Sequence, residues 1–273
     1  MEPWPPPDPD AVPDAAIVPT GSGIRALAAL KDLDALGIDV VLDATDEVPP
    51  PEACGRICSV LYRDPSVERI QVTESSLAEI ERTHGLARGQ IAIELLITAP
   101  RSFLEIDELA AASGRIVSLI TDPAMLPEAF GVEGSTEIDQ FAYPRGRLIL
   151  AAAHRRMYSV GLFGAAGHHR IAAAGRDAAQ FSFSIGLHGG LCRTWDDVRA
   201  CNRGFTPDDG RVTRARRIIE AMEEAGRQGL GAISLDGRMI DLPFIRSSES
   251  TLRLAKHAAA RAQQVGRMFA RQG

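Results

Sequence analysis

Short apolar runs rich in β-branched residues alternate along this chain with longer stretches of helical periodicity. Apolar runs of this length between helical stretches are typical of parallel strands that helices cover on both faces. Many such units in one chain of 273 residues favour a closed (β/α) barrel over an open sheet. The strands that the pattern predicts are 17–19, 39–43, 69–72, 90–98, 115–121, 158–164 and 189–195.

The predicted helices and the flanking segments divide the chain into three parts. Residues 1–14 hold six prolines and four acids without apolar periodicity, which predicts a disordered arm. Residues 15–205 are predicted to form the α/β barrel. Residues 206–273 are predicted to hold two long helices, at 208–226 and 243–270, with Thr206 as the N-cap of the first and Pro207 at its first position. The apolar stripe of the second is Leu252, Ala255, Ala259 and Ala262, and the predicted barrel helices are 24–37, 51–62, 75–83, 103–113, 145–156 and 168–179.

Composition excludes several functions. The net charge of −6 and the pI near 5.6 argue against a nucleic-acid surface, because phosphate binding needs clustered cations. No stretch approaches the roughly 18 apolar residues of a membrane span, and the first residues lack the blocks of a signal peptide, so we expect a cytoplasmic protein. A Schiff-base aldolase is also excluded, because the two lysines, Lys31 and Lys256, both fall in amphipathic helical patterns.

The cysteines indicate no metal or redox motif. Cys54, Cys58, Cys192 and Cys201 lack CxxC spacing, so neither a zinc knuckle nor a redox pair is predicted. We therefore expect all four to be buried thiols, which behave as small hydrophobic side chains.

Two segments carry a family resemblance. Gln90–Gly131 resembles, without a gap, the part of the citrate lyase β-subunit and malyl-CoA lyase (HpcH/HpaI aldolase) family that reads IET…RG and then FGxxD. Phe205–Pro207 and Asp236–Asp241 resemble that family's FTP…DGxMID signature, and the likeness extends over about residues 16–255. It implies a TIM-type barrel that makes or breaks carbon–carbon bonds of hydroxyacyl-CoA such as malyl-, citramalyl- or citryl-CoA. It also implies magnesium and a trimer or hexamer, with 206–273 as a lid and oligomerisation segment.

The two acids of the family motif are replaced here by Thr98 and Met125. In the family these acids hold magnesium, which stabilises the charge that develops on a keto acid or enolate. A threonine hydroxyl is a weak magnesium ligand, and magnesium does not use a thioether, so we expect no metal at this position. Thr98, Met125 and Arg101 remain candidates for substrate contact, and Thr20 and Ser22, in a glycine-rich turn before a helix, could contact a phosphate.

Other acids could serve as catalytic or metal-binding residues away from the two motif positions. Asp43 and Asp46 follow the second strand, and they could bind a cation, orient water or serve only as loop and capping residues. Asp241 matches the family aspartate that acts at the neighbouring subunit's barrel mouth, although it also suits a turn. The remaining candidates are Asp122, expected to cap a turn; Glu94, expected to be a structural acid at the bottom of the barrel, perhaps paired to arginine; His168 and His169, a weak metal site; and His188, expected to be structural.

The region around the third strand departs from the family. The motifs LDATDEV (42–48) and IQVTESS (70–76) resemble the family's LDLEDAV and LPKVES, but residues 49–69 leave room for little more than one helix. We therefore predict that the third strand is missing, or vestigial near 58–62, and that the family arginine is lost unless Arg63 is its remnant.

These observations leave three functional hypotheses open. The first is a degenerate family member that acts as an accessory or ligand-binding protein for a CoA thioester or small keto acid. The second is an active lyase or acyl-CoA thioesterase that uses Asp43, Asp46, Asp122 or Asp241. The third is a subunit of a hetero-oligomer whose site is completed by an intact homologue.

Overall fold

A computed structural model describes residues 10, 12–19, 39–44, 57–135, 138–161 and 178–270. The chain divides into two compact units, Met1–Gly204 and Phe205–Gly273. Each unit is described by itself below.

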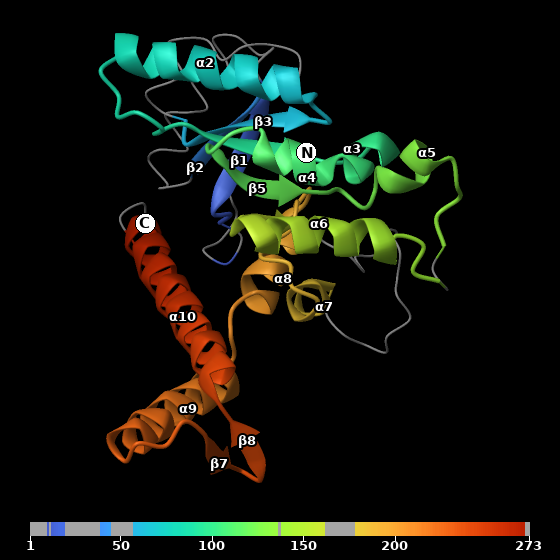
Figure 1. The fold of residues 1–273 in the computed structure, drawn as a ribbon. Helices are drawn as coiled ribbons and strands as arrows, with labels where there is room; N and C mark the ends of the chain where they lie inside the picture. Colours follow the sequence, from blue (N-terminus) through green and yellow to red (C-terminus); the bar gives the residue numbers. More distant parts are fainter. Residues whose placement is uncertain are drawn as a thin grey trace. The chain divides into compact units, whose positions relative to one another are not determined.

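The first unit is built on a curled, six-stranded parallel sheet (Figure 1). Each strand pairs with the next one in the chain, from β1 to β6, and a single parallel bridge from Val160 to Gly189 extends the last edge. A doubly wound sheet would reverse its order at a switch point, whereas an unbroken order is that of a (β/α) barrel. The α/β class and parallel topology are therefore confirmed. The strands are β1 Ala15–Pro19, β2 Asp39–Asp43, β3 Ser59–Arg63, β4 Ala92–Leu96, β5 Ile116–Ile120 and β6 Tyr158–Val160.

The prediction that the third strand is missing or vestigial was wrong, as was the strand predicted at 69–72. β3 lies at Ser59–Arg63, where only a vestigial strand was expected, and it pairs fully with β4. Residues 69–72 belong instead to helix α2, Val67–Thr83, whose N-cap Ser66 accepts a hydrogen bond from the Arg69 amide. The physical reason is the spacing of the buried residues Ile70, Thr73, Leu77 and Glu81, which recur at helical rather than strand intervals.

The last predicted strand, 189–195, is also mostly wrong. Within it only Gly189 makes a bridge, and Trp195 already begins helix α8, Trp195–Gly204. The Thr194 hydroxyl accepts a hydrogen bond from the Asp197 amide, and the Asp197 carboxylate accepts one from Thr194. This reciprocal cap starts a helix where the apolar run had predicted a strand.

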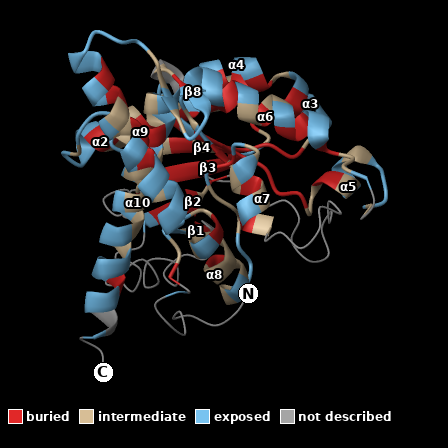
Figure 2. Ribbon diagram, turned by 90° about the horizontal axis from the view of Figure 1, so that it is seen from below, coloured by how far each residue is buried: buried red, intermediate tan, exposed pale blue. Residues whose placement is uncertain are grey.

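Helices α2, α4 (Ile106–Ala111) and α6 (Ala142–Arg155) pack side by side over the sheet (Figure 1). Their buried residues turn toward the strands and their exposed residues face outward (Figure 2). The predicted helix at 145–156 is confirmed by α6, while the one at 103–113 is broken into α3 (Pro100–Leu104) and α4. Short helices α5 (Leu126–Phe130) and α7 (Ala178–Ser184) also belong to this unit.

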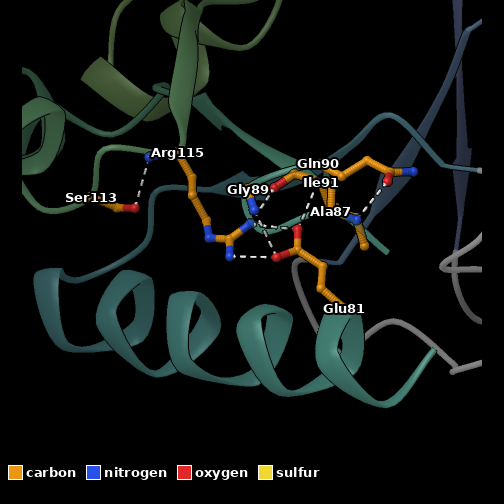
Figure 3. A network of polar contacts seen from close by, with 7 residues as sticks. All are labelled: Glu81, Ala87, Gly89, Gln90, Ile91, Ser113 and Arg115. Atoms are coloured by element: carbon orange, nitrogen blue, oxygen red, sulfur yellow. Dashed lines mark hydrogen bonds and ion pairs between the residues drawn. The ribbon is translucent and has the colours of Figure 1, made fainter. Parts of the chain in front are cut away.

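A buried ion pair ties α2 to the sheet (Figure 3). Both guanidinium nitrogens of Arg115 lie 2.7 Å from the Glu81 carboxylate oxygens, and both side chains are less than a tenth exposed. Glu81 also accepts hydrogen bonds from the amides of Gly89 and Ile91. The Arg115 hydrogen bonds, and secondarily these amides, lower the pKa of Glu81 to about 2 against the opposing effect of burial. Such complete pairing is what makes a buried charge tolerable.

Helices α7 and α8 approach each other closely at Gly204. A Cβ atom added there would lie 2.3 Å from the Ala179 Cβ and 2.8 Å from the Gln180 amide nitrogen. Glycine is therefore required at this contact for packing.

The second unit is an antiparallel helix pair with a small hairpin. Helix α9 (Asp209–Arg227) begins at Asp208, whose carboxylate accepts from the Arg211 amide, so Thr206 is not the cap that the sequence predicted. A hairpin follows, in which Asp236 and Gly237, both at positive φ, join β7 (Ile233–Leu235) to β8 (Arg238–Ile240). The hydrophobic core of this unit contains Ile218, Met222 and Ile240. The long helix α10 spans Leu242–Phe269. No described helix combines the length and apolar character that a bilayer crossing requires.

Candidate functional site

Polar residues lie at, or two residues after, the carboxyl ends of four neighbouring strands of the first unit. Below them Val41, Leu61, Leu96 and Ile120 form one buried cluster across β2 to β5. Side chains alternate along a strand, so the residues two positions further on continue the same face of the sheet. These residues are Asp43, Arg63, Thr98 and Asp122, and we call this set the strand-end site.

Thr98 is held by an acid that the sequence had not singled out. Asp64, directly after β3, accepts hydrogen bonds from the Thr98 hydroxyl and from the amides of Thr98 and Ala99, the latter two at 2.8 and 2.9 Å. The Asp64 backbone has φ of 43°, a left-handed conformation that aspartate tolerates better than most residues. The carboxylate thus closes the start of α3, where Ala99 has no side-chain cap to offer.

Asp122 is held in a similar way from another direction. Its side chain is 8% exposed and forms an ion pair with the guanidinium of Arg193, which lies after the Gly189 bridge. One carboxylate oxygen also accepts from the Ala124 amide at 3.0 Å, so the expected turn-capping role is confirmed. Arg193 lies outside the strands and far from Asp122 in the sequence. Only the tertiary fold brings its guanidinium next to the Asp122 carboxylate.

The other predicted contact residues of this unit are placed as follows. Met125, the residue before α5, is half-buried and donates its amide to the Asp122 carbonyl. Arg101 lies on α3 with its side chain 84% exposed and pairs with Glu105 at 2.8 Å. That hydrogen bond, followed by the charge of Glu105, raises the pKa of Arg101. Arg101 as a substrate contact therefore stays a prediction.

Glu94 lies on β4, two residues before Leu96 and therefore below the apolar cluster. Among the described residues its partners are the hydroxyls of Ser59 and Ser118, at 2.5 and 2.8 Å, and not an arginine. The thiol of Cys58, which precedes β3, donates a hydrogen bond to the Val40 carbonyl. Burial is the main reason why the pKa of this thiol is raised. Glu94 is thus hydrogen-bonded inside the sheet, and an arginine partner stays a prediction, because several arginines lie outside the described residues.

His188 also fills a structural role at this level. Its Nδ1 lies 3.2 Å from the Ser159 amide and 3.0 Å from the Ser159 hydroxyl. Burial is the main cause that lowers the pKa of the imidazole, and a backbone hydrogen bond of Ser159 opposes this only in part. The ring therefore favours the neutral form that accepts a hydrogen bond.

Asp241 belongs to the second unit. It follows β8, is half-buried, and its carbonyl accepts from the Phe244 amide at 3.0 Å at the start of α10. The turn role is therefore present, and a catalytic role stays a prediction. Thr20, Ser22, Asp46, His168 and His169 lie outside the described residues.

The cysteines differ from the prediction that all are buried. Cys192 is exposed, while Cys58 and Cys201 are half-buried. Cys54 lies outside the described residues. The Sγ atoms of Cys192 and Cys201 are 3.5 Å apart, although their spacing in the chain matched no redox motif.

Within the described ranges, no three His, Cys, Asp or Glu side chains gather in a way that could hold a metal ion. The donor set of the strand-end site agrees with this, because Thr98 and Asp122 are already bonded to Asp64 and Arg193.

A hollow on the outer helices lies between α4 and α6. It is lined by Asp107, Arg147, Leu150, Ala151, His154 and Arg155.

Comparison with known proteins supports the resemblance seen in the sequence. No protein-family model matches the chain. The L-malyl-CoA/β-methylmalyl-CoA lyase of Rhodobacter capsulatus is 26% identical over 204 residues, which cover 69% of this chain and 64% of that enzyme. The citrate lyase β-subunit of Haemophilus influenzae is 27% identical over 209 residues, covering 72% of this chain and 70% of that subunit. The chain thus spans less than two thirds of the malyl-CoA lyase it matches.

Solved structures show the same fold. A citrate lyase from Burkholderia xenovorans aligns with a TM-score of 0.65 at 15% identity, over 94% of this chain and 98% of that one. The CitE protein of Mycobacterium tuberculosis, solved with magnesium, acetoacetate and coenzyme A, aligns with a TM-score of 0.62 at 20% identity, over 89% and 90% of the two chains.

Proposed function

We propose that this chain, a homologue of the malyl-CoA lyases and of the citrate lyase β-subunit, is a CoA-thioester or keto-acid binding member of that family that works without magnesium. It acts as an accessory or ligand-binding subunit in the cytoplasm. Its assembly is a homo-oligomer, a trimer or hexamer, or a hetero-oligomer with an intact homologue, with residues 206–273 as lid and oligomerisation segment.

The observation that carries this proposal is the pairing of the strand-end site. Asp64 accepts three hydrogen bonds from Thr98 and Ala99. The charge of Asp122 is neutralised by Arg193. Magnesium binds through hard oxygen ligands and keeps near-ideal octahedral geometry, so it would have to displace these donors first. Arg193 supplies a positive charge beside Asp122 without a metal.

A fixed arginine changes the chemistry that the site can support. The guanidinium can bind the carboxylate of a keto acid or the carbonyl of a thioester by hydrogen bonds. It offers no open coordination position, so it cannot chelate a keto acid and polarise its carbonyl as a Lewis acid does. Binding without carbon–carbon cleavage follows from that difference.

Calorimetric titration of the full chain tests the proposal. Acetyl-CoA, pyruvate and glyoxylate are titrated separately, each with and without magnesium chloride. We expect binding of at least one of them with the same affinity in both conditions and no heat from magnesium alone. Tight magnesium binding, or ligand affinity that requires it, would overturn the proposal.

The alternative is an active lyase or acyl-CoA thioesterase that uses relocated acids. The buried carboxylate of Asp122 favours it, because a carboxylate at the end of a barrel strand is well placed for acid–base work. Incubation with malyl-CoA and citramalyl-CoA, followed by quantification of free CoA and acetyl-CoA, separates the two. Turnover that Asp122→Asn abolishes while Asp107→Asn leaves it intact would establish the alternative.

A further inference from the structure

We propose that Cys192 and Cys201 form a reversible disulfide that fixes the segment carrying Arg193 to helix α8. The two Sγ atoms lie 3.5 Å apart, and a disulfide needs about 2.05 Å. Rotation of the side chains and a small shift of the exposed segment before α8 can close that gap. The proposal concerns the thiol pair alone and does not require any particular ligand at the strand-end site.

Accessibility allows the reaction to start at one of the two residues. Cys192 is exposed, so a dissolved oxidant can reach its sulfur, whereas Cys201 is half-buried on α8. This asymmetry matches the usual division between an attacking thiol and a resolving thiol. Cys58 is also half-buried, but it bonds to the Val40 carbonyl and lies in the interior of the sheet.

The surroundings explain what the bond would do. Arg193 lies between Cys192 and Thr194, and the amides of Arg193 and Thr194 both donate to the Asp197 carboxylate, at 3.2 and 3.1 Å. One side of Arg193 is therefore already attached to the first turn of α8. A disulfide would attach the other side to the same helix and so restrict the guanidinium that pairs with Asp122.

The reaction balances with a low-molecular-weight disulfide such as glutathione disulfide as oxidant. The Cys192 thiolate attacks one sulfur of glutathione disulfide, forms a mixed disulfide and releases one glutathione thiolate. The Cys201 thiolate then attacks the Cys192 sulfur and releases the second. The protein loses two protons and two electrons, and the oxidant is reduced to two molecules of glutathione.

Peptide mapping of the full chain tests the proposal directly. The protein is equilibrated in glutathione buffers of increasing disulfide fraction, alkylated under denaturing conditions and digested with trypsin. Cleavage after Arg176, Arg193, Arg199 and Arg203 separates the two cysteines, so the bond would join peptides 177–193 and 200–203. We expect this joined pair, lighter by two hydrogens, to appear with oxidation and to vanish with dithiothreitol.

Single variants distinguish the outcomes. Cys201→Ser should accumulate glutathione on Cys192, because no resolving thiol remains, whereas the control Cys58→Ser should still form the joined peptides. In the oxidised wild-type protein, amide hydrogen exchange should slow in residues 190–199 and stay unchanged in α6. Persistent glutathione on wild-type Cys192, two alkylated cysteines at every buffer ratio, or unchanged exchange in 190–199 would each overturn the proposal.

Discussion

The Asp64 carboxylate accepts hydrogen bonds from both the hydroxyl and the amide of Thr98, and so binds the end of β3 to the end of β4. Thr98, which the sequence resemblance led us to expect at a metal-ligand position, is thus a donor to a neighbouring acid. Its hydroxyl stabilises the fold by donating to that carboxylate.

Asp64→Ala is expected to lower the free energy of unfolding by about 2–3 kcal/mol, because it leaves buried donors unpaired and places alanine at positive φ. Asp64→Asn keeps one acceptor oxygen and tolerates the same φ, so its cost should be smaller. Urea denaturation of the three proteins measures the difference. Equal stability of Asp64→Ala and wild type would show that the contact is not formed in solution.

The Glu81–Arg115 pair predicts a pH dependence of stability. The pKa of Glu81 is lower in the folded chain, at about 2, than its ordinary value of 4.5, so folding favours the charged form. Its contribution is fully present above the unfolded pKa and is lost as pH falls from about 5 toward 2; it is on the order of 3 kcal/mol.

Urea denaturation between pH 7 and pH 2 measures this contribution. Glu81→Gln should be less stable at pH 7 by about 3–5 kcal/mol, because Arg115 then lacks its counter-charge. Its stability should also fall less steeply than that of wild type below pH 5. Parallel pH profiles of the two proteins would contradict the assignment.

Thr121→Val is expected to stabilise the first unit by about 1 kcal/mol. The Thr121 side chain is fully buried, and its hydroxyl is the one buried side-chain polar atom of the described chain without a hydrogen-bond partner. The matched control is Thr73→Val, since the buried Thr73 hydroxyl donates to the Arg69 carbonyl at 2.9 Å. A gain for Thr121→Val and no gain for the control, measured by urea denaturation, is the expected result.

Gly204→Ala is expected to destabilise the packing of α7 against α8 by about 1–3 kcal/mol, because the new methyl group would overlap Ala179 and the backbone of Gln180. Gly146→Ala serves as the control. That glycine is exposed within α6 with no atom near its added Cβ, so alanine should stabilise by about 0.5–1 kcal/mol. Thermal denaturation should move in opposite directions for the two variants.

Arg193→Met is expected to weaken binding of a carboxylate or thioester ligand by about tenfold to a hundredfold, because a charge-assisted hydrogen bond is lost. Arg82→Met removes a similarly exposed arginine of α2, paired with Glu79, and should bind as wild type does. Isothermal titration with the ligand found for the wild type provides the comparison. Identical affinities for the two variants would remove Arg193 from the site.

Part of the fold could be predicted because local patterns carried it. The runs at 39–43, 90–98 and 115–121 fold as β2, β4 and β5, since long β-branched runs leave little choice of structure. Residues 69–72, predicted as a strand, lie in α2, because Ile70, Thr73 and Leu77 recur at helical spacing. Asp64 could have been noticed as the acid after the run SVLYR, had that run been recognised as a strand.

The sequence by itself determined the alternation of strand and helix and the likeness to citrate lyase β-subunits and malyl-CoA lyases. Only the tertiary structure decided that Asp64 holds Thr98, that Arg193 neutralises Asp122 and that Cys192 meets Cys201. The reason is physical. Periodicity reports local backbone preference, whereas the partner of a charged or polar group depends on which distant segments the packed strands bring within hydrogen-bond reach.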